Sequence, residues 1–109
     1  MTATPYPADW LRGLLTTCVL KTLEKGPTYG YAIITQLAEA GLGDIKGGTL
    51  YPLLNRLENR GLVEVQWREG DGGPGRKYFF LTDAGTQELA TLTVTWQTFS
   101  TTVTTHLTH

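Results

Sequence analysis

The chain has 109 residues, which is the length of one small domain. Hydrophobic residues make up 40% of it and charged residues 17%, so it is neither a disordered polar chain nor a charged coiled-coil rod. Nine Lys and Arg residues against ten Asp and Glu residues leave a net charge of −1. This balance excludes nucleic-acid binding through bulk positive charge and leaves room for a local basic site.

The sequence carries no pattern typical of an enzyme or a metalloprotein. The single cysteine, Cys18, excludes an intramolecular disulfide and a cysteine-based zinc cluster. His106 and His109 are interpreted as part of a frayed tail rather than as metal ligands. We therefore expect no catalytic residue, cofactor or metal. Without a secretory leader or an apolar run of about 18–20 residues, we also expect a cytoplasmic protein that makes no membrane contact.

A first helix is predicted over residues 10–23, where apolar side chains recur at helical spacing and cover more than half of the circumference. A helix with so wide an apolar surface is buried on two sides, and in a short chain the second side can belong to another subunit. Gly26 and Pro27 end this helix. Residues 1–9 before it are expected to form an N-terminal arm.

A second helix is expected to begin with Thr28 as its cap and to end at Gly41. Its apolar face consists of Ile33, Ile34, Leu37 and Ala38. Residues 41–48 hold four glycines and predict a turn.

A third helix follows that turn. Its apolar face consists of Leu50, Leu53, Leu54 and Leu57. Because Pro52 has no N–H and is tolerated only in the first turn, the helix is expected to begin near Gly48 or Thr49. Gly61 ends it.

A β-hairpin is predicted next. Over residues 62–68 apolar and polar side chains alternate with the period of a half-buried strand, and residues 76–81 form a second, aromatic strand. Residues 70–75 are rich in glycine and are expected to form a six-residue tip.

The last predicted helix starts with Thr82 as its cap and with Asp83 at the positive end of its dipole. The segment after Glu88 has no charged residue and is rich in threonine, a poor helix former, so we expect another chain to hold it by packing. Its apolar residues follow heptad spacing. They are Leu89, Leu92, Trp96, Phe99 and Val103.

This order of elements predicts a mainly α fold with a small β-hairpin, the winged helix-turn-helix. Residues 10–81 are expected to form the DNA-binding domain, and residues 82–109 the dimerisation helix and tail. In this arrangement the third helix enters the major groove and the wing touches the neighbouring backbone or minor groove.

The expected DNA-facing side chains are polar, basic or aromatic, types that bind phosphates and base edges. Between residues 46 and 80, six basic residues against four acidic ones leave a charge of +2, in contrast to the whole chain. The DNA-binding candidates are Tyr31, Lys46, Thr49, Tyr51, Pro52, Asn55, Arg56, Arg76 and Lys77.

Simpler interpretations stay open for the helix residues. Tyr51 and Tyr31 can be packing residues with satisfied hydroxyls, and Arg56 can pair with a neighbour on a solvated helix face, either Glu58 or Asn59. Arg60 lies near the helix end and can simply stabilise its negative pole.

The wing and the tryptophans allow simpler interpretations too. Arg76 and Lys77 can be ordinary hairpin cations beside Glu69 and Asp71, with side chains on opposite faces of the strand. Trp10 and Trp67 are interpreted as packing residues. Cys18 is interpreted as a small buried hydrophobe rather than a redox sensor.

Five ordered segments carry a specific resemblance. They are Gly30-Tyr31, Gly48-Thr49-Leu50-Tyr51-Pro52-Leu53-Leu54 with Arg56-Leu57-Glu58, Gly61-Leu62-Val63, Gly73-Pro74-Gly75-Arg76-Lys77-Tyr78, and Leu81-Thr82-Asp83-Ala84-Gly85. In these segments the chain resembles the PadR family of regulators, over roughly residues 11 to 100. With its short last helix it is similar to the small subfamily that lacks a large C-terminal domain.

The resemblance implies a dimeric bacterial transcriptional regulator, usually a repressor, that binds a pseudo-palindromic operator on double-stranded DNA. It implies a homodimer formed by the first and last helices. The interface candidates are Trp10, Leu11, Leu89, Leu92, Trp96, Phe99 and Val103.

The resemblance also implies a small-molecule effector, because phenolic acids or planar drugs release DNA from several members. Trp96 aligns with a tryptophan that lines a hydrophobic pore at the dimer centre, where two indoles could sandwich a flat aromatic ligand. Filling the dimer seam is the simpler role for Trp96. The effector-binding candidates are Leu14, Thr17, Cys18, Trp96 and Phe99.

Two other functions stay open at this stage. Winged helices also serve as protein-interaction modules without DNA binding, and the net charge of −1 is compatible with that role. A protein that only sequesters a ligand is the second alternative.

Overall fold

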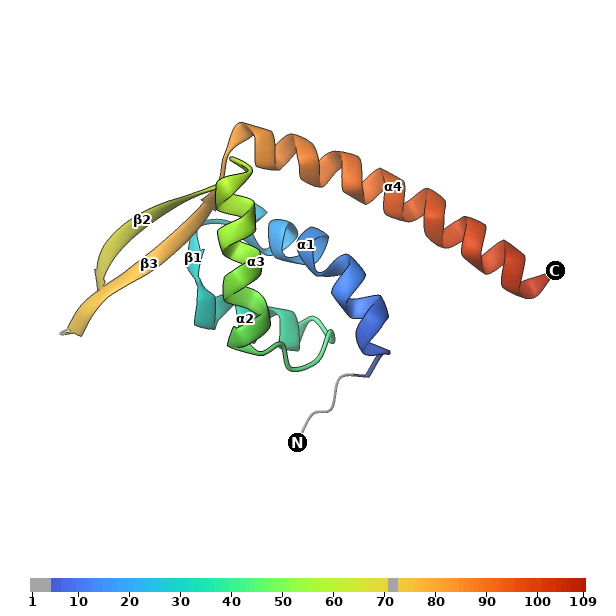
Figure 1. The fold of residues 1–109 in the computed structure, drawn as a ribbon, viewed down its shortest axis with the longest axis horizontal. Helices are drawn as coiled ribbons and strands as arrows, with labels where there is room; N and C mark the ends of the chain where they lie inside the picture. Colours follow the sequence, from blue (N-terminus) through green and yellow to red (C-terminus); the bar gives the residue numbers. More distant parts are fainter. Residues whose placement is uncertain (1–4, 71–72) are drawn as a thin grey trace.

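The computed structural model describes residues 5–70 and 73–109. The elements follow in the order α1 (Ala8–Glu24), β1 (Thr28–Tyr29), α2 (Gly30–Glu39), α3 (Gly47–Asn59), β2 (Val63–Gly70), β3 (Gly73–Leu81) and α4 (Asp83–Thr108). Within these ranges, four helices and a small antiparallel sheet form a mainly α winged helix, as predicted (Figure 1). Residues 1–4 of the expected arm, and Asp71 and Gly72 of the expected hairpin tip, lie outside the described residues.

The sheet has the strand order β1-β3-β2, and both pairings are antiparallel. The short strand β1 was not predicted, and the expectation that Thr28 caps α2 is wrong. Thr28 pairs with Phe79 in the sheet, so its backbone is extended. The residue before α2 is Tyr29, and its side chain makes no capping hydrogen bond.

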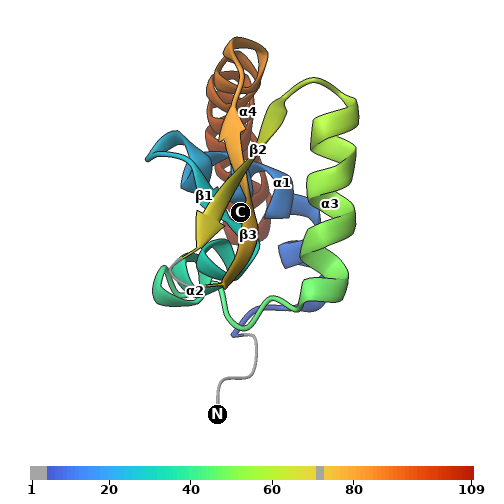
Figure 2. The same ribbon diagram turned by 90° about the vertical axis from the view of Figure 1, so that its left-hand side faces the viewer.

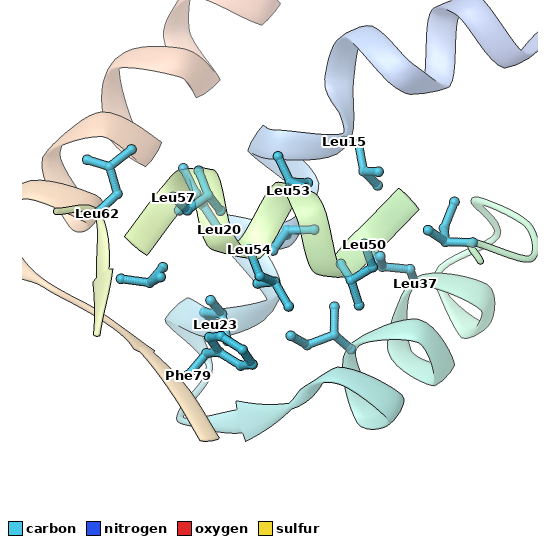
Figure 3. Packing of buried hydrophobic residues seen from close by; sticks show 14 of the residues in the cluster. Leu15, Leu20, Leu23, Leu37, Leu50, Leu53, Leu54, Leu57, Leu62 and Phe79 are labelled. Carbon is cyan, nitrogen blue, oxygen red and sulfur yellow. The ribbon is translucent and has the colours of Figure 1, made fainter. Parts of the chain in front are cut away.

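Leucines of α3 fill the space between the other helices and the sheet (Figure 3). The positions predicted to be apolar on this helix are all buried, as is Phe79 of β3. The second helix buries less than expected, because Ile34 is only partly buried and Ala38 is exposed. The buried core consists of Leu15, Val19, Leu20, Leu23, Ile33, Leu37, Ile45, Leu50, Leu53, Leu54, Leu57, Leu62, Val63, Phe79 and Leu89.

The third helix begins at Gly47, before the predicted start, and the expectation that Pro52 lies in its first turn is wrong. The carbonyl oxygen of Lys46 accepts from the N–H groups of both Thr49 and Leu50, at 3.0 Å each, so the glycines join the helix. Pro52 then lies in the second turn. The carbonyl that it leaves without a helical donor belongs to Gly48, which is exposed.

Several predicted ends are confirmed. Gly41 and Gly61 follow α2 and α3 with φ angles of 91° and 74°, a left-handed conformation that favours glycine. The hydroxyl of Thr82 accepts from the N–H of Gly85 at 3.0 Å and caps α4. The strands of the wing are longer than predicted, because Gly70 still pairs with Gly73 inside the expected tip.

The 26-residue helix α4 packs its N-terminal part on α1, and its C-terminal half projects away from the rest of the chain (Figure 1). Leu89 is buried and Leu92 partly so, but the apolar residues that continue the same stripe are exposed. They are Trp96, Phe99, Val103 and Leu107. Across the described ranges, no helix is long and apolar enough to cross a membrane.

Candidate nucleic-acid interface

The outward face of α3 carries the polar residues that the sequence predicts there. With the leucines turned to the core, the helix exposes Thr49, Tyr51, Pro52, Asn55 and Arg56. Viewed with the wing toward the reader, this helix stands to one side of the sheet (Figure 2). The polar residues from Thr49 to Arg56 are therefore exposed to a partner.

The two arginines of this helix differ in their partners. Arg60 Nη2 lies 3.3 Å from Glu88 Oε2, which ties the C-terminal end of α3 to α4. Among the described residues Arg56 makes no ion pair with Glu58, and its guanidinium is exposed. The structure therefore leaves Arg56 free for a ligand and gives Arg60 a structural partner.

Tyr51 packs on α2 and is still 47% exposed. Its ring lies against Gly30, where an added Cβ would overlap the phenol ring and hydroxyl. The adjacent glycine–tyrosine motif thus has a physical reason: Gly30 makes room for Tyr51, and Tyr31 beside it is 70% exposed. Tyr51 can therefore be both a packing residue and a DNA-facing residue, because only part of its ring is covered.

A groove of about 350 Å³ opens between the start of α2, the N-terminal half of α3 and strand β3. We call it the tyrosine groove. It brings together four predicted DNA-binding residues, which come from three distant parts of the sequence. Its lining residues are Tyr29, Gly30, Tyr31, Tyr51, Arg76, Lys77 and Phe79.

Within the described residues, aromatic rings hold the cations of the wing, and the Gln66 amide oxygen also accepts hydrogen bonds from Arg68. The guanidinium of Arg76 lies 4.5 Å from the ring centroid of Tyr29, and that of Arg68 lies 4.6 Å from the ring of Tyr78. The two tyrosine rings meet edge to face at 5.4 Å. Cation–π contacts of this kind stabilise and orient the guanidinium groups.

Arg76 and Lys77 point to opposite faces of β3, as expected, since Lys77 Nζ lies 5.5 Å from the ring of Phe79 on the core side. Within the described residues neither cation pairs with Glu69. The alternative partner, Asp71, lies outside the described residues. Lys46 does have an acidic neighbour, since its Nζ lies 3.0 Å from Asp44 Oδ2 in an exposed pair of small energetic value.

The sequence ranks Tyr29 below Tyr31 as a possible phosphate contact and does not identify Tyr78 as a functional residue. Their role depends on the pairing of β1 with β3, which joins segments about fifty residues apart. The alternation of Arg76, Tyr78 and Phe80 predicts that these three side chains share one face of a strand. It does not predict that Tyr29 joins them from β1.

The expected interface and effector residues lie on α1 and α4, which pack together. Leu14, Thr17 and Cys18 are partly buried, and burial raises the pKa of the Cys18 thiol. Trp96 and Phe99 are exposed neighbours with ring centroids 6.4 Å apart.

Trp10 and Trp67, which the sequence analysis interprets as packing residues, do not pack in the core of this chain. Trp10 is 67% exposed and Trp67 is 69% exposed. Trp10 lies in the first turn of α1, before the core leucines begin, and Trp67 lies on the wing beyond the last core residue.

Known proteins share this arrangement. The model of the transcriptional regulator PadR-like family matches residues 19–91. A PadR family transcriptional regulator from Eggerthella lenta superposes with a TM-score of 0.84 at 37% identity, over 92% of this chain and 87% of that one. A PadR-like transcriptional regulator from Bacillus cereus gives a TM-score of 0.83 at 33% identity, over 94% and 99% of the two chains.

A PadR-like transcription factor from Bacteroides fragilis is 40% identical, with a TM-score of 0.76 over 89% of this chain and 93% of that one. The matched region runs from α1 through the polar face of α3 and the wing into α4. The chain belongs to the PadR-like family of transcriptional regulators.

Proposed function

We propose that this protein is a homodimeric repressor that reads a pseudo-palindromic operator with α3 and leaves it when a flat aromatic effector binds. The observation that carries the proposal is the exposed polar face of α3 beside the tyrosine groove. Two such faces related by two-fold symmetry read half-sites about one helical turn apart, near 34 Å.

Base reading is assigned to the middle of α3. Asn55 pairs with adenine and Arg56 with guanine or a phosphate, the contacts that suit these side chains best. Both are exposed on the face opposite the core leucines. Thr49 and Pro52 lie on the same exposed side and set the approach of the helix to the groove floor.

Phosphate contacts are assigned to the tyrosine groove and its neighbours. Tyr31 and Tyr51 present hydroxyl groups there, and Arg76 and Lys77 supply positive charge. Lys46 adds a third cation at the start of α3. Contacts of this kind fix the orientation of the protein on the duplex and carry no sequence information directly.

Dimerisation is assigned to the exposed stripe of α4 together with α1. Trp96, Phe99 and Val103 continue the line of the buried Leu89, and in a single chain nothing within the described residues covers them. Burial of such side chains against a second copy stabilises the dimer by roughly 1.5–3 kcal/mol for each large residue. Trp10 and Leu11 of α1 and Leu92 of α4 complete the proposed interface.

The effector site is assigned to the same interface. Two Trp96 indoles, one from each subunit, would stack on the two faces of a planar aromatic ring. Phe99 would complete the aromatic wall, and Leu14, Thr17 and Cys18 would line the side formed by α1. A ligand releases DNA only if it binds one spacing of the two reading heads more tightly than the other.

A titration of a fluorescent duplex from the region upstream of the gene tests the regulator. We expect binding that resists competitor DNA and weakens with salt with a log–log slope of about −0.9 per phosphate contact. Arg56→Ala should lower the affinity about tenfold, within the range measured for a lost base contact. Lys21→Ala is the matched control, because it also removes an exposed positive charge, on the distant α1 helix.

Two results would contradict the proposal. Equal binding of operator and competitor in a genome-wide selection would favour a protein-interaction module. Equal affinities for the wild type and a folded Arg56→Ala dimer would remove that residue from the reading face.

The effector is tested with a phenolic acid and a planar polycyclic dye. We expect either compound to release the duplex, with no release from the Trp96→Ala variant. Ligand binding by a protein that selects no operator would instead indicate a sequestering protein.

A further inference from the structure

The largest side chain on the wing is exposed to solvent. Trp67 is 69% exposed, although on the same face of the strand Val63 is buried and Val65 is partly buried. Val63 faces Leu81, Val65 faces Phe79, and Trp67 faces Lys77 along this one side of the hairpin. The face that starts in the core therefore ends in an exposed indole.

The direction of this face follows from the pairing. Residues directly opposite each other in an antiparallel pair project to the same side. Trp67 therefore lies on the Lys77 side of the wing, and Lys77 lines the tyrosine groove together with Tyr31 and Tyr51; Arg76 reaches the same groove from the opposite side of the strand. Arg68 and Tyr78 lie on the other side, in the cation–π contact described above.

The proposed dimer seam does not account for Trp67. The wing and the C-terminal half of α4 project toward opposite ends of the molecule (Figure 1). A second copy packed on the exposed stripe of α4 leaves the wing open. The indole is therefore placed beside the proposed reading surface and away from the proposed subunit interface.

The neighbours of the indole favour a nucleic-acid partner. Lys77, a cation that also lines the tyrosine groove, lies beside it on the paired strand. On its other flank is Gly75, where an added Cβ would lie 3.7 Å from Cε3 of the indole and 3.3 Å from the carbonyl oxygen of Arg68. The ring thus has a phosphate-binding group on one flank and a glycine on the other.

We propose that Trp67 contacts DNA through its indole, which lies against the sugars and base edges of the minor groove that flanks the major groove read by α3. Apolar side chains of minor-groove-binding proteins make such contacts, and cations beside them bind the bordering phosphates. This inference rests on the proposed function and adds a contact that widens the footprint beyond the reading helix.

The first test is the affinity of Trp67→Ala for the operator. We expect a loss of about fivefold or more, the scale measured for one aromatic ring lost from contact with bases. The matched control is Glu64→Gln, which alters an exposed side chain on the other face of the same strand and should bind no more weakly than the wild type. Equal affinities for wild type and Trp67→Ala would overturn the inference.

A shortened operator locates the contact. On a duplex trimmed to end before the wing, the wild type and Trp67→Ala should bind equally. A difference that persists on the trimmed duplex would place Trp67 elsewhere and overturn the minor-groove assignment. A wild type that binds neither duplex would refute the proposed function itself, so the two failures are distinguishable.

Fluorescence gives a readout that does not depend on the alanine variant. DNA added to the wild type should quench indole emission, and the part of the quenching that comes from Trp67 should be absent in Trp67→Phe. Identical quenching in the two proteins would show that Trp67 stays in water on the complex. Circular dichroism melting should give both variants the wild-type Tm, because the side chain is exposed.

Discussion

The phenol ring of Tyr51 rests on the backbone of Gly30, so the first residue of α2 and the N-terminal half of α3 meet without a side chain between them. The contact fixes the position of the Tyr51 hydroxyl, which is proposed to bind a DNA phosphate. Any larger residue at position 30 displaces the ring, so the contact depends on this glycine.

Gly30→Ala should separate binding from stability. The new Cβ meets only the far end of the Tyr51 side chain, which can swing into solvent. We therefore expect the free energy of unfolding to fall by about 1 kcal/mol or less, because the displaced ring is already half exposed and no core side chain moves. Operator affinity should fall to the level of Tyr51→Ala, and the double variant should show no further loss. Additive losses of affinity in the double variant would contradict the idea that both substitutions act through the Tyr51 ring.

Gly85→Ala should be strongly destabilising. Its Cβ would overlap the backbone carbonyl of Leu62, which also accepts the Thr82 N–H at 3.1 Å and cannot move aside. Overpacking of this kind costs about 1–3 kcal/mol, to be measured by urea unfolding. Gly13→Ala is the control, because Gly13 lies in α1 with no atom near its missing Cβ. That variant should gain about 0.5–1 kcal/mol from helix propensity.

The Cys18 thiol should react slowly in the native protein. Burial raises its pKa, so at a given alkaline pH the folded chain holds less of the reactive thiolate than the unfolded chain. Alkylation by iodoacetamide should therefore follow a pH profile shifted upward relative to the same protein in urea. A native rate equal to the unfolded rate would contradict this.

The same shift has a consequence for stability. Below the pKa of the unfolded thiol both states are protonated and the contribution is zero. Above it the unfolded state loses the proton first, so stability falls as pH rises toward the higher pKa of the folded state. Cys18→Ala should remove this part of the alkaline pH dependence, as urea titrations at several pH values will show.

Phe99→Glu should yield a folded monomer. The substitution places a charge inside the proposed seam of α4, where a buried unpaired carboxylate is costly. Thr98→Glu adds the same charge at the adjacent exposed position, off the apolar stripe, and should remain a dimer. Sedimentation velocity at micromolar concentration distinguishes the two. A dimer that survives Phe99→Glu would place the interface elsewhere.

Local signals in the sequence were sufficient for most of the fold. The leucine spacing of α3, the Thr82 cap and the glycines that end α2 and α3 all act within one or two helical turns. The exposed polar face of α3 follows from the same spacing, since a helix that buries its leucines turns the residues between them outward.

What the sequence could not provide depends on contacts between distant residues. Strand β1 has two residues and forms only because β3 offers it an edge. The Arg76–Tyr29 contact and the tyrosine groove require that pairing first. The alternation that predicted a half-buried strand continues through Trp67, but the core ends at Val65 and Phe79, and no local pattern marks where a core stops.

Helix α4 has no charged side chain after Glu88. The proposed dimer and the proposed complex with DNA should therefore differ in how they respond to salt. An electrically neutral seam responds little to ionic strength, whereas contacts with phosphates weaken steeply as salt rises. A rise in salt concentration should therefore release the protein from DNA as an intact dimer. At low occupancy, the fraction of operator bound is then proportional to the concentration of the preformed dimer. Doubling the amount of protein in the cell doubles this fraction, rather than quadrupling it.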